Sequence, residues 1–163
     1  MEIERKFLLP VLPEIKCEGR KRIEQRYISV EPEVRIRKTD TDCYITFKGK
    51  GDLAREEVEI VIDQKEYASL VPFAISNAIT KTRYLFRLGE YTAEADVYGG
   101  ELEGLMAVEV EFKSTEEAYA FIPPAWFGTE ITYDKRFKNR VIAFMSKEEA
   151  RVFVASLRNG YEK

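Results

Sequence analysis

Apolar and polar side chains alternate along most of residues 2–113. Because successive side chains of a β-strand point to opposite faces, this alternation predicts strands whose two faces differ in polarity. Gly89 and the pair Gly99 and Gly100 separate the later segments and are typical of turns. The pattern predicts eight strands, at residues 2–9, 22–30, 33–39, 42–50, 54–62, 79–88, 90–98 and 105–113.

Helices are expected after the fifth strand and in the C-terminal third. Asp63 is a candidate N-cap for a helix over 63–77, which Pro72 ends or kinks. Ser114 and Asp134 are candidate N-caps further on. The C-terminal helices are expected at residues 114–122, 134–146 and 147–157, with a loop at 123–132.

The two faces of the predicted strands carry different chemistry. One face is mostly apolar, as at Ile3, Phe7 and Val110, and needs a cover that the apolar residues of the C-terminal helices can supply. The other face is charged, and nearly every strand offers two charges of one sign at positions i and i+2. Its acidic residues are Glu2, Glu4, Glu57, Glu59, Glu94, Asp96, Glu109 and Glu111. Its basic residues are Lys6, Arg35, Arg37, Lys48, Arg55, Lys81, Arg83 and Arg87.

Two interpretations of the charged face are open. For any single strand, it reads most simply as the solvated face of an antiparallel sheet. Like charges two residues apart repel, however, and acidic and basic strands alternate along the chain. Eight antiparallel strands can also close into a barrel. We therefore predict an α+β fold, an eight-stranded antiparallel closed β-barrel whose charged face lines a tunnel and whose helices pack outside.

Composition limits the class of protein. The 163 residues, 45% hydrophobic and 34% charged, fit one domain spanning residues 1–163. Twenty-six basic and 29 acidic residues give a net charge of -3, which argues against a nucleic-acid partner but permits a local basic pocket. The two cysteines lack metal or disulfide spacing. Neither a membrane-spanning run nor a signal peptide is visible, so we expect a cytoplasmic protein.

The chemistry available to the tunnel is restricted. The chain has no histidine, which removes the commonest general base and zinc ligand. The inward acidic and basic residues balance, so two divalent cations would leave a positive surplus suited to a triphosphate. Arginine forks match phosphate oxygens. The hard carboxylates suit Mg²⁺ or Mn²⁺.

The ordered motifs resemble those of a known family. "EIERKF" contains the pattern Glu-x-Glu-x-Lys, and it is followed by "EQRYIS", "VRIRK", "YITFKGK", "REEVEI", "KTRY", "EADVYGG", "LEGLMAVEVEF" and "WFGTEITYDKRFKN". This set is similar to the CYTH domain, or triphosphate tunnel metalloenzyme, family in its short bacterial form. A tyrosine is more usual where Phe137 stands, and we expect that change to affect packing. The family's fold is an eight-stranded antiparallel tunnel.

The resemblance implies roles for the inward residues. The phosphate-binding residues would be Arg35, Arg37, Lys48, Arg55, Lys81 and Arg83. The ligands of two Mg²⁺ or Mn²⁺ ions would be drawn from Glu2, Glu4, Glu57, Glu59, Asp96, Glu109 and Glu111. Lys6 and Tyr27 resemble a pair that activates water, which would require depressed pKa values. The alternatives are a salt bridge for Lys6 and packing for Tyr27.

The resemblance implies a metal-dependent triphosphatase acting on inorganic tripolyphosphate or a related triphosphate. The alternatives are a class IV adenylate cyclase, a thiamine triphosphatase, or a non-catalytic module that binds polyphosphate or nucleotides. The expected partner is a small-molecule triphosphate, without nucleic acid or membrane. A homodimer is one option that the sequence leaves open.

Overall fold

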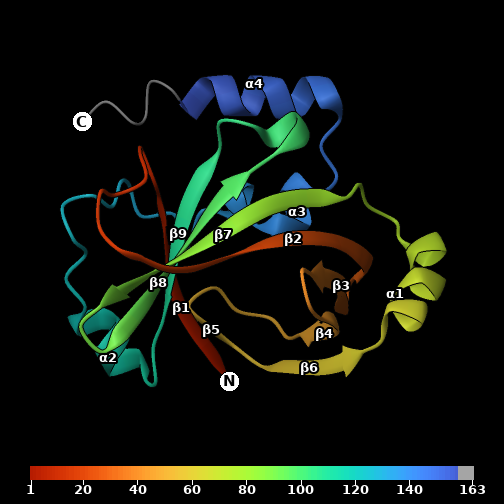
Figure 1. Cartoon of the computed structure of the whole chain (residues 1–163), viewed down its shortest axis with the longest axis horizontal. Coiled ribbons are helices and arrows are strands. Elements are labelled where there is room, and N and C mark those ends of the chain that lie inside the picture. The colour runs from red at the N-terminus through yellow and green to blue at the C-terminus, as the bar shows by residue number, and fades with distance from the viewer. Residues whose placement is uncertain (158–163) are drawn as a thin grey trace.

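The computed structural model describes residues 1–157. In this part of the chain, nine strands form one antiparallel sheet in the order β5-β1-β9-β8-β7-β2-β3-β4-β6 (Figure 1). The strands are β1 (Glu2–Leu8), β2 (Cys17–Val30), β3 (Glu33–Thr39), β4 (Cys43–Lys48), β5 (Ala54–Arg55), β6 (Glu57–Ile62), β7 (Ile79–Leu88), β8 (Tyr91–Tyr98) and β9 (Met106–Glu111). The α-helices are α1 (Gln64–Leu70), α2 (Thr115–Ala120), α3 (Asn139–Ile142) and α4 (Lys147–Leu157). Three short 3₁₀ helices are η1 (Val71–Phe73), η2 (Gly100–Leu102) and η3 (Lys135–Phe137).

The predicted closed barrel of eight strands is not confirmed. The predicted strand at 54–62 divides at Glu56, so that β5 pairs with β1 while β6 pairs with β4. The Glu56 carbonyl accepts a hydrogen bond from the Gly49 amide, where the pairing with β4 ends. No ladder joins β5 to β6 within the described residues. The α+β class and the large antiparallel sheet are confirmed, and the two sheet edges lie one residue apart in the chain.

Several predicted elements have different bounds. β2 begins at Cys17, five residues before the predicted start at 22, because its first part pairs with β7. The predicted helix at 63–77 is α1 followed by η1, which contains Pro72. The predicted helix at 134–146 is reduced to η3 and the single turn of α3.

The predicted helix starts are confirmed. The Asp63 carboxylate accepts a hydrogen bond from the Glu66 amide in a capping box. The Ser114 side chain accepts one from the Glu117 amide. Asp134 caps the 3₁₀ helix η3 rather than an α-helix.

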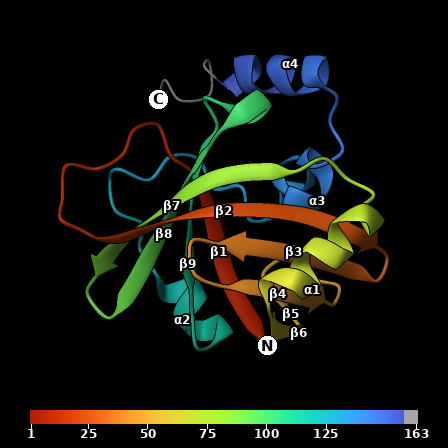
Figure 2. The ribbon, with the colours of Figure 1, turned by 45° about the vertical axis from the view of Figure 1, so that its right-hand side comes forward.

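The outer, apolar face of the sheet is covered unevenly. Ile3 and Phe7 are buried with Phe112, which directly follows β9, and with Phe127, and the Phe7 and Phe127 ring centroids are 5.0 Å apart. α1, α2 and α4 lie on different sides of the strands (Figures 1 and 2). The outward side chains of β4 and β6 remain partly uncovered, as at Val58, which is 58% exposed.

The C-terminal helices bury fewer apolar residues than predicted. Ile142 and Leu157 enter the core, while Val141 and Val152 stay exposed. Phe137 is buried and packs on Phe153, which confirms a packing role for that position. Among the described residues, no helix has the length and apolar character needed to cross a membrane.

Residues 128–132 bring the C-terminal segment to the inner face of the sheet. The Leu8 amide donates to the Thr129 carbonyl at 2.8 Å, and the Ile131 amide donates to the Lys6 carbonyl at 2.8 Å. This segment therefore follows the edge of β1 beyond β5. The following residues, η3 and α3, reach the charged inner face of the sheet.

Candidate active site

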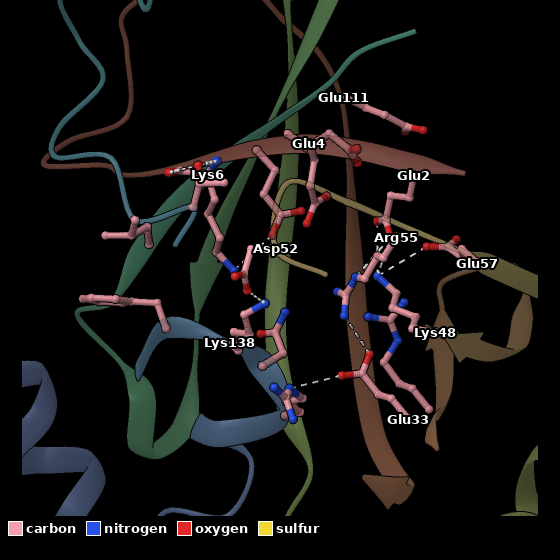
Figure 3. A pocket seen from close by; sticks show the side chains of 18 of the residues that line it. Glu2, Glu4, Lys6, Glu33, Lys48, Asp52, Arg55, Glu57, Glu111 and Lys138 are labelled. Carbon is pink, nitrogen blue, oxygen red and sulfur yellow. Dashed lines mark hydrogen bonds and ion pairs between the residues drawn. The ribbon is translucent and has the colours of Figure 1, made fainter. Parts of the chain in front are cut away.

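The inner face of the sheet encloses a cavity of about 230 Å³, called the site cavity below (Figure 3). Side chains from all nine described strands line it, together with Asp52 and several of residues 131–140. Thirteen of the fifteen predicted site residues are among its lining residues. They are Glu2, Glu4, Lys6, Tyr27, Arg35, Arg37, Lys48, Arg55, Glu57, Glu59, Arg83, Glu109 and Glu111. The predicted inward orientation of the charged face is therefore correct for these residues.

Lys81 and Asp96 do not line the site cavity. Their side chains are 0% and 1% exposed, and the Lys81 ammonium lies 2.7 Å from the Asp96 carboxylate. The same carboxylate accepts two hydrogen bonds from Arg83, at 2.7 and 2.9 Å. Burial opposes ionisation of Asp96, but Arg83 and Lys81 outweigh it and lower its pKa to about 2. The pair supports Arg83 from behind, which does not match the predicted phosphate-binding and metal-binding roles of Lys81 and Asp96.

Most cationic groups of the site cavity are paired with carboxylates. Lys6 contacts Glu109 at 3.1 Å, and Lys48 contacts Glu2 at 3.0 Å. The remaining ion pairs are Lys48 with Glu57 (3.3 Å), Arg55 with Glu33 (3.2 Å) and Glu2 (3.7 Å), Arg83 with Glu94 (2.8 Å) and Glu109 (3.4 Å), Arg140 with Glu33 (3.6 Å) and Lys138 with Asp52. These pairs form a network around the cavity, part of which is visible in Figure 3.

Arg35 and Arg37 are the exceptions in the described part of the chain. Neither guanidinium has a carboxylate partner within ion-pair distance, although both line the site cavity. Arg35 is 5% exposed and its Nε has no hydrogen-bond partner. Burial, together with Arg35 and Arg83, lowers the pKa of Arg37 to about 10, so it stays charged at neutral pH. These two uncompensated cations make β3 the anion-attracting side of the cavity.

Two carboxylates without an ion pair lie on another side, and a third, Glu59 of β6, accepts a hydrogen bond from Thr46. Glu4 and Glu111 are direct cross-strand partners on β1 and β9, and neither forms an ion pair with a described residue. Burial and the charges of Glu109 and Glu2 raise the pKa of Glu4 to about 8. Burial and nearby carboxylates, Glu2 first, also raise the pKa of Glu111. Like charges on cross-strand partners are destabilising, and Glu2 raises the pKa of both residues, so this acidic side favours a cation.

The acidic side fits a hard divalent cation by donor type and charge. Mg²⁺ and Mn²⁺ prefer carboxylate oxygens, and Glu2, Glu4 and Glu111 lie along the same side of the cavity (Figure 3). Within residues 1–157, no three acidic or cysteine side chains converge closely enough to form a ready-made metal site. Glu2 is held by Lys48 instead.

The protein groups around Lys6 and Tyr27 raise, rather than depress, the pKa of both side chains. Burial lowers the pKa of Lys6, but its interactions with Tyr98, Glu109 and Glu4 outweigh this effect and raise the pKa overall. Burial raises the pKa of Tyr27, which is 2% exposed and belongs to the apolar core. The salt bridge and packing interpretations therefore describe their contacts.

Several lining residues were missed by the strand pattern. Glu33 lies two residues before Arg35, so strict alternation places it on the same face. Asp52 lies in the turn after β4 and Lys138 lies beside α3, where no strand period applies. The basic segment after Asp134 was the only sequence signal for Lys138 and Arg140.

Acidic side chains outnumber basic ones around the site cavity, which corrects the balanced charge inferred from sequence. The basic lining residues are Lys6, Arg35, Arg37, Lys48, Arg55, Arg83, Lys138 and Arg140. The acidic lining residues are Glu2, Glu4, Glu33, Asp52, Glu57, Glu59, Glu94, Glu109, Glu111 and Asp134. An anion therefore enters this cavity more favourably together with a cation than alone.

Comparisons with known proteins agree with this geometry. An inorganic triphosphatase of Nitrosomonas europaea is 42% identical over 146 residues, covering 87% of this chain and 96% of that protein. One of Acetivibrio thermocellus is 32% identical over 142 residues, covering 85% and 90%. A crystal structure of an inorganic triphosphatase aligns with a TM-score of 0.67 at 39% identity, covering 90% of this chain and 96% of that chain. The CYTH domain model matches residues 1–122, and the chain belongs to the CYTH domain family.

Proposed function

We propose that the protein is a metal-dependent inorganic triphosphatase that hydrolyses tripolyphosphate. The observation that carries this proposal is the separation of uncompensated charge within one cavity, with Arg35 and Arg37 on β3 and Glu4 and Glu111 on β1 and β9. Such a cavity offers one side to phosphate oxygens and another to a divalent cation. The relatives described above as inorganic triphosphatases support the same activity.

The size of the site cavity favours a small inorganic substrate. Its volume of about 230 Å³ is below the roughly 300–1,000 Å³ of sites for drug-sized ligands. An adjoining cavity of about 580 Å³ shares Lys48, Arg55 and Lys138 with it, and within residues 1–157 no aromatic side chain on which a base could stack lines this second cavity. These features weigh against the adenylate cyclase and thiamine triphosphatase alternatives.

In the proposed mechanism, Arg35 and Arg37 bind phosphate oxygens, and Arg83, braced by Asp96, adds a third guanidinium. Positioning and charge neutralisation supply most of the rate in phosphoryl transfer. Lys48 and Arg55 are the remaining proposed phosphate-binding residues, and they would exchange Glu2, Glu57 and Glu33 for phosphate.

Glu4 and Glu111 would hold Mg²⁺ or Mn²⁺, with further proposed ligands from Glu2, Glu57, Glu59 and Glu109. When bound, the metal would neutralise phosphate charge and lower the pKa of a coordinated water. Lys6 remains an ammonium beside Glu109, where it adds positive charge near the reacting phosphate. Tyr27 packs beneath this region rather than acting as a base.

Phosphate release from tripolyphosphate tests the proposal. We expect release with Mg²⁺ or Mn²⁺ and none in excess EDTA, with ATP and thiamine triphosphate as poorer substrates. Undiminished release in EDTA would refute the metal dependence. Cyclic AMP formation from ATP would instead favour the cyclase, and tight binding without turnover would favour the non-catalytic module.

A further inference from the structure

Gln25 is a fully buried polar residue of β2 that the proposed mechanism does not use. It is 0% exposed and lies directly opposite Arg37 on β3. Its side-chain Oε1 accepts two hydrogen bonds from the Arg37 guanidinium, from Nε at 3.2 Å and from Nη2 at 3.0 Å. Because two donors of one planar group meet the same oxygen, Gln25 restricts both the position and the plane of that guanidinium.

Arg37 differs from the carboxylate-paired cations of the site cavity in the charge of its partner. Arg55 and Arg83 are each held by carboxylates, which also cancel their charge. An amide oxygen holds a guanidinium without cancelling its charge. Arg37 therefore combines a fixed orientation with an uncompensated positive charge.

The orientation of the Gln25 amide supports this role. Its Nε2 has no hydrogen-bond partner among the described residues. The reverse orientation would place the NH₂ group against a guanidinium that has only donors. A buried donor without an acceptor is unfavourable. The Gln25 amide is therefore oriented so that its oxygen accepts both hydrogen bonds from Arg37, although its NH₂ group is left without an acceptor.

We propose that Gln25 is a positioning residue that fixes the Arg37 guanidinium while leaving its charge available to the phosphate chain. The inference rests on the proposed function insofar as it takes tripolyphosphate as the anion. A carboxylate at this position would keep the geometry and remove the free charge. An apolar side chain of similar size would keep the charge and remove the geometry.

The test compares Gln25→Glu and Gln25→Met with Gln64→Glu, a control that adds the same charge on the exposed surface of α1. Binding of tripolyphosphate is measured by calorimetry with Ca²⁺, which should support little turnover, and kcat and KM are measured with Mg²⁺. We expect Gln25→Glu to weaken binding and raise KM by about tenfold or more, the scale of one charge-assisted hydrogen bond. Gln64→Glu should match the wild type.

A double-mutant cycle tests whether Gln25 acts through Arg37. Gln25→Met should weaken binding in the wild-type background and change it by less than about twofold in the Arg37→Ala background. Equal effects in both backgrounds, or wild-type binding by Gln25→Glu, would overturn the inference. If the wild type binds tripolyphosphate but releases no phosphate, the proposed function fails and the binding comparison still decides the role of Gln25. If Gln25→Glu does not fold, the cycle with Gln25→Met decides.

Discussion

Glu4 and Glu111 face each other across neighbouring strands, and neither carboxylate has a cationic partner within the described part of the chain. Glu94 and Glu109 differ from them, because Arg83 contacts both of these carboxylates. The uncompensated pair is unfavourable in the metal-free protein and favourable once a divalent cation binds. Stability and activity therefore place opposite demands on these two residues.

The pH dependence of stability in EDTA should reveal this conflict at Glu4. Its pKa is raised from 4.5 to about 8, so the folded state retains a proton that the unfolded state loses between these values. The free energy of unfolding should therefore fall as pH rises from about 5 to about 8, at up to about 1.4 kcal/mol per pH unit. Urea denaturation at several pH values measures it.

Glu4→Gln provides the control, because it removes the titrating carboxyl and keeps the side-chain shape. We expect this variant to lose most of the fall in stability across that pH range and to lose metal-dependent turnover. If the free energy of unfolding depends on pH in the same way in the variant and the wild type, Glu4 is not the group whose ionisation destabilises the folded protein.

The acidic and basic sides of the site cavity should respond differently to metal concentration. Arg35→Ala should raise KM for tripolyphosphate by about tenfold or more, because a charge-assisted contact to phosphate is lost. Glu111→Gln should weaken metal affinity, so excess Mg²⁺ should partly restore its turnover and not that of Arg35→Ala. Steady-state kinetics over a range of Mg²⁺ concentrations separates the two.

Arg87→Ala is the matched control for the arginine variant. Arg87 was predicted to point inward, but it is exposed and absent from the lining of the site cavity. Its replacement should leave KM within about twofold of the wild type. Equal rescue of Arg35→Ala and Glu111→Gln by metal would mean that the two sides are wrongly assigned.

Alternation along the sequence predicted which face of its strand a charged side chain occupies, but it did not predict how deeply that side chain is buried. Period-two alternation placed Glu2, Glu4 and Lys6 on one face, because side chains two residues apart in a strand point to the same side of the sheet. The same rule put Lys81 and Asp96 on the inner face, yet they lie beneath Arg83, since alternation says nothing of how far a side chain reaches.

The closure of the sheet could not be predicted for a related reason. The stretch "AREEVEIVI" alternates without a break, so nothing local marks Glu56 as the point where pairing passes from β1 to β4. Asp52 and Lys138 come from a turn and a short helical segment, where neither strand nor helix periodicity applies. Their meeting depends on long-range packing.

Lys6 should act through its charge. Its ammonium contacts Glu109 at 3.1 Å, and its pKa is raised, so it stays protonated at neutral pH. Lys6→Arg should therefore retain a measurable part of the wild-type kcat, whereas Lys6→Met should lose nearly all of it. A general base would tolerate neither replacement, and equal loss of activity in both variants would support that role.

The Lys6→Met variant should also be less stable than the wild type. Removing one partner of a buried pair costs about 3–5 kcal/mol, although Arg83 at 3.4 Å still compensates part of the Glu109 charge. We therefore expect a loss toward the lower end of this range. Thermal denaturation measures it.

Asp96 should prove to be a structural support for Arg83 rather than a metal ligand. Asp96→Asn leaves Lys81 and Arg83 without their carboxylate, and we expect it to lower the free energy of unfolding by about 3–5 kcal/mol. Because the pKa of Asp96 is lowered to about 2, its contribution is present above about pH 4 and is lost as pH falls toward 2. The wild type should therefore lose more stability than Asp96→Asn across that acidic range.

Denaturation curves at neutral and acidic pH, combined with Mg²⁺ titration of turnover, decide between the roles. A metal ligand would give a variant of normal stability whose activity recovers in excess Mg²⁺, whereas a support for Arg83 gives an unstable variant whose activity does not recover.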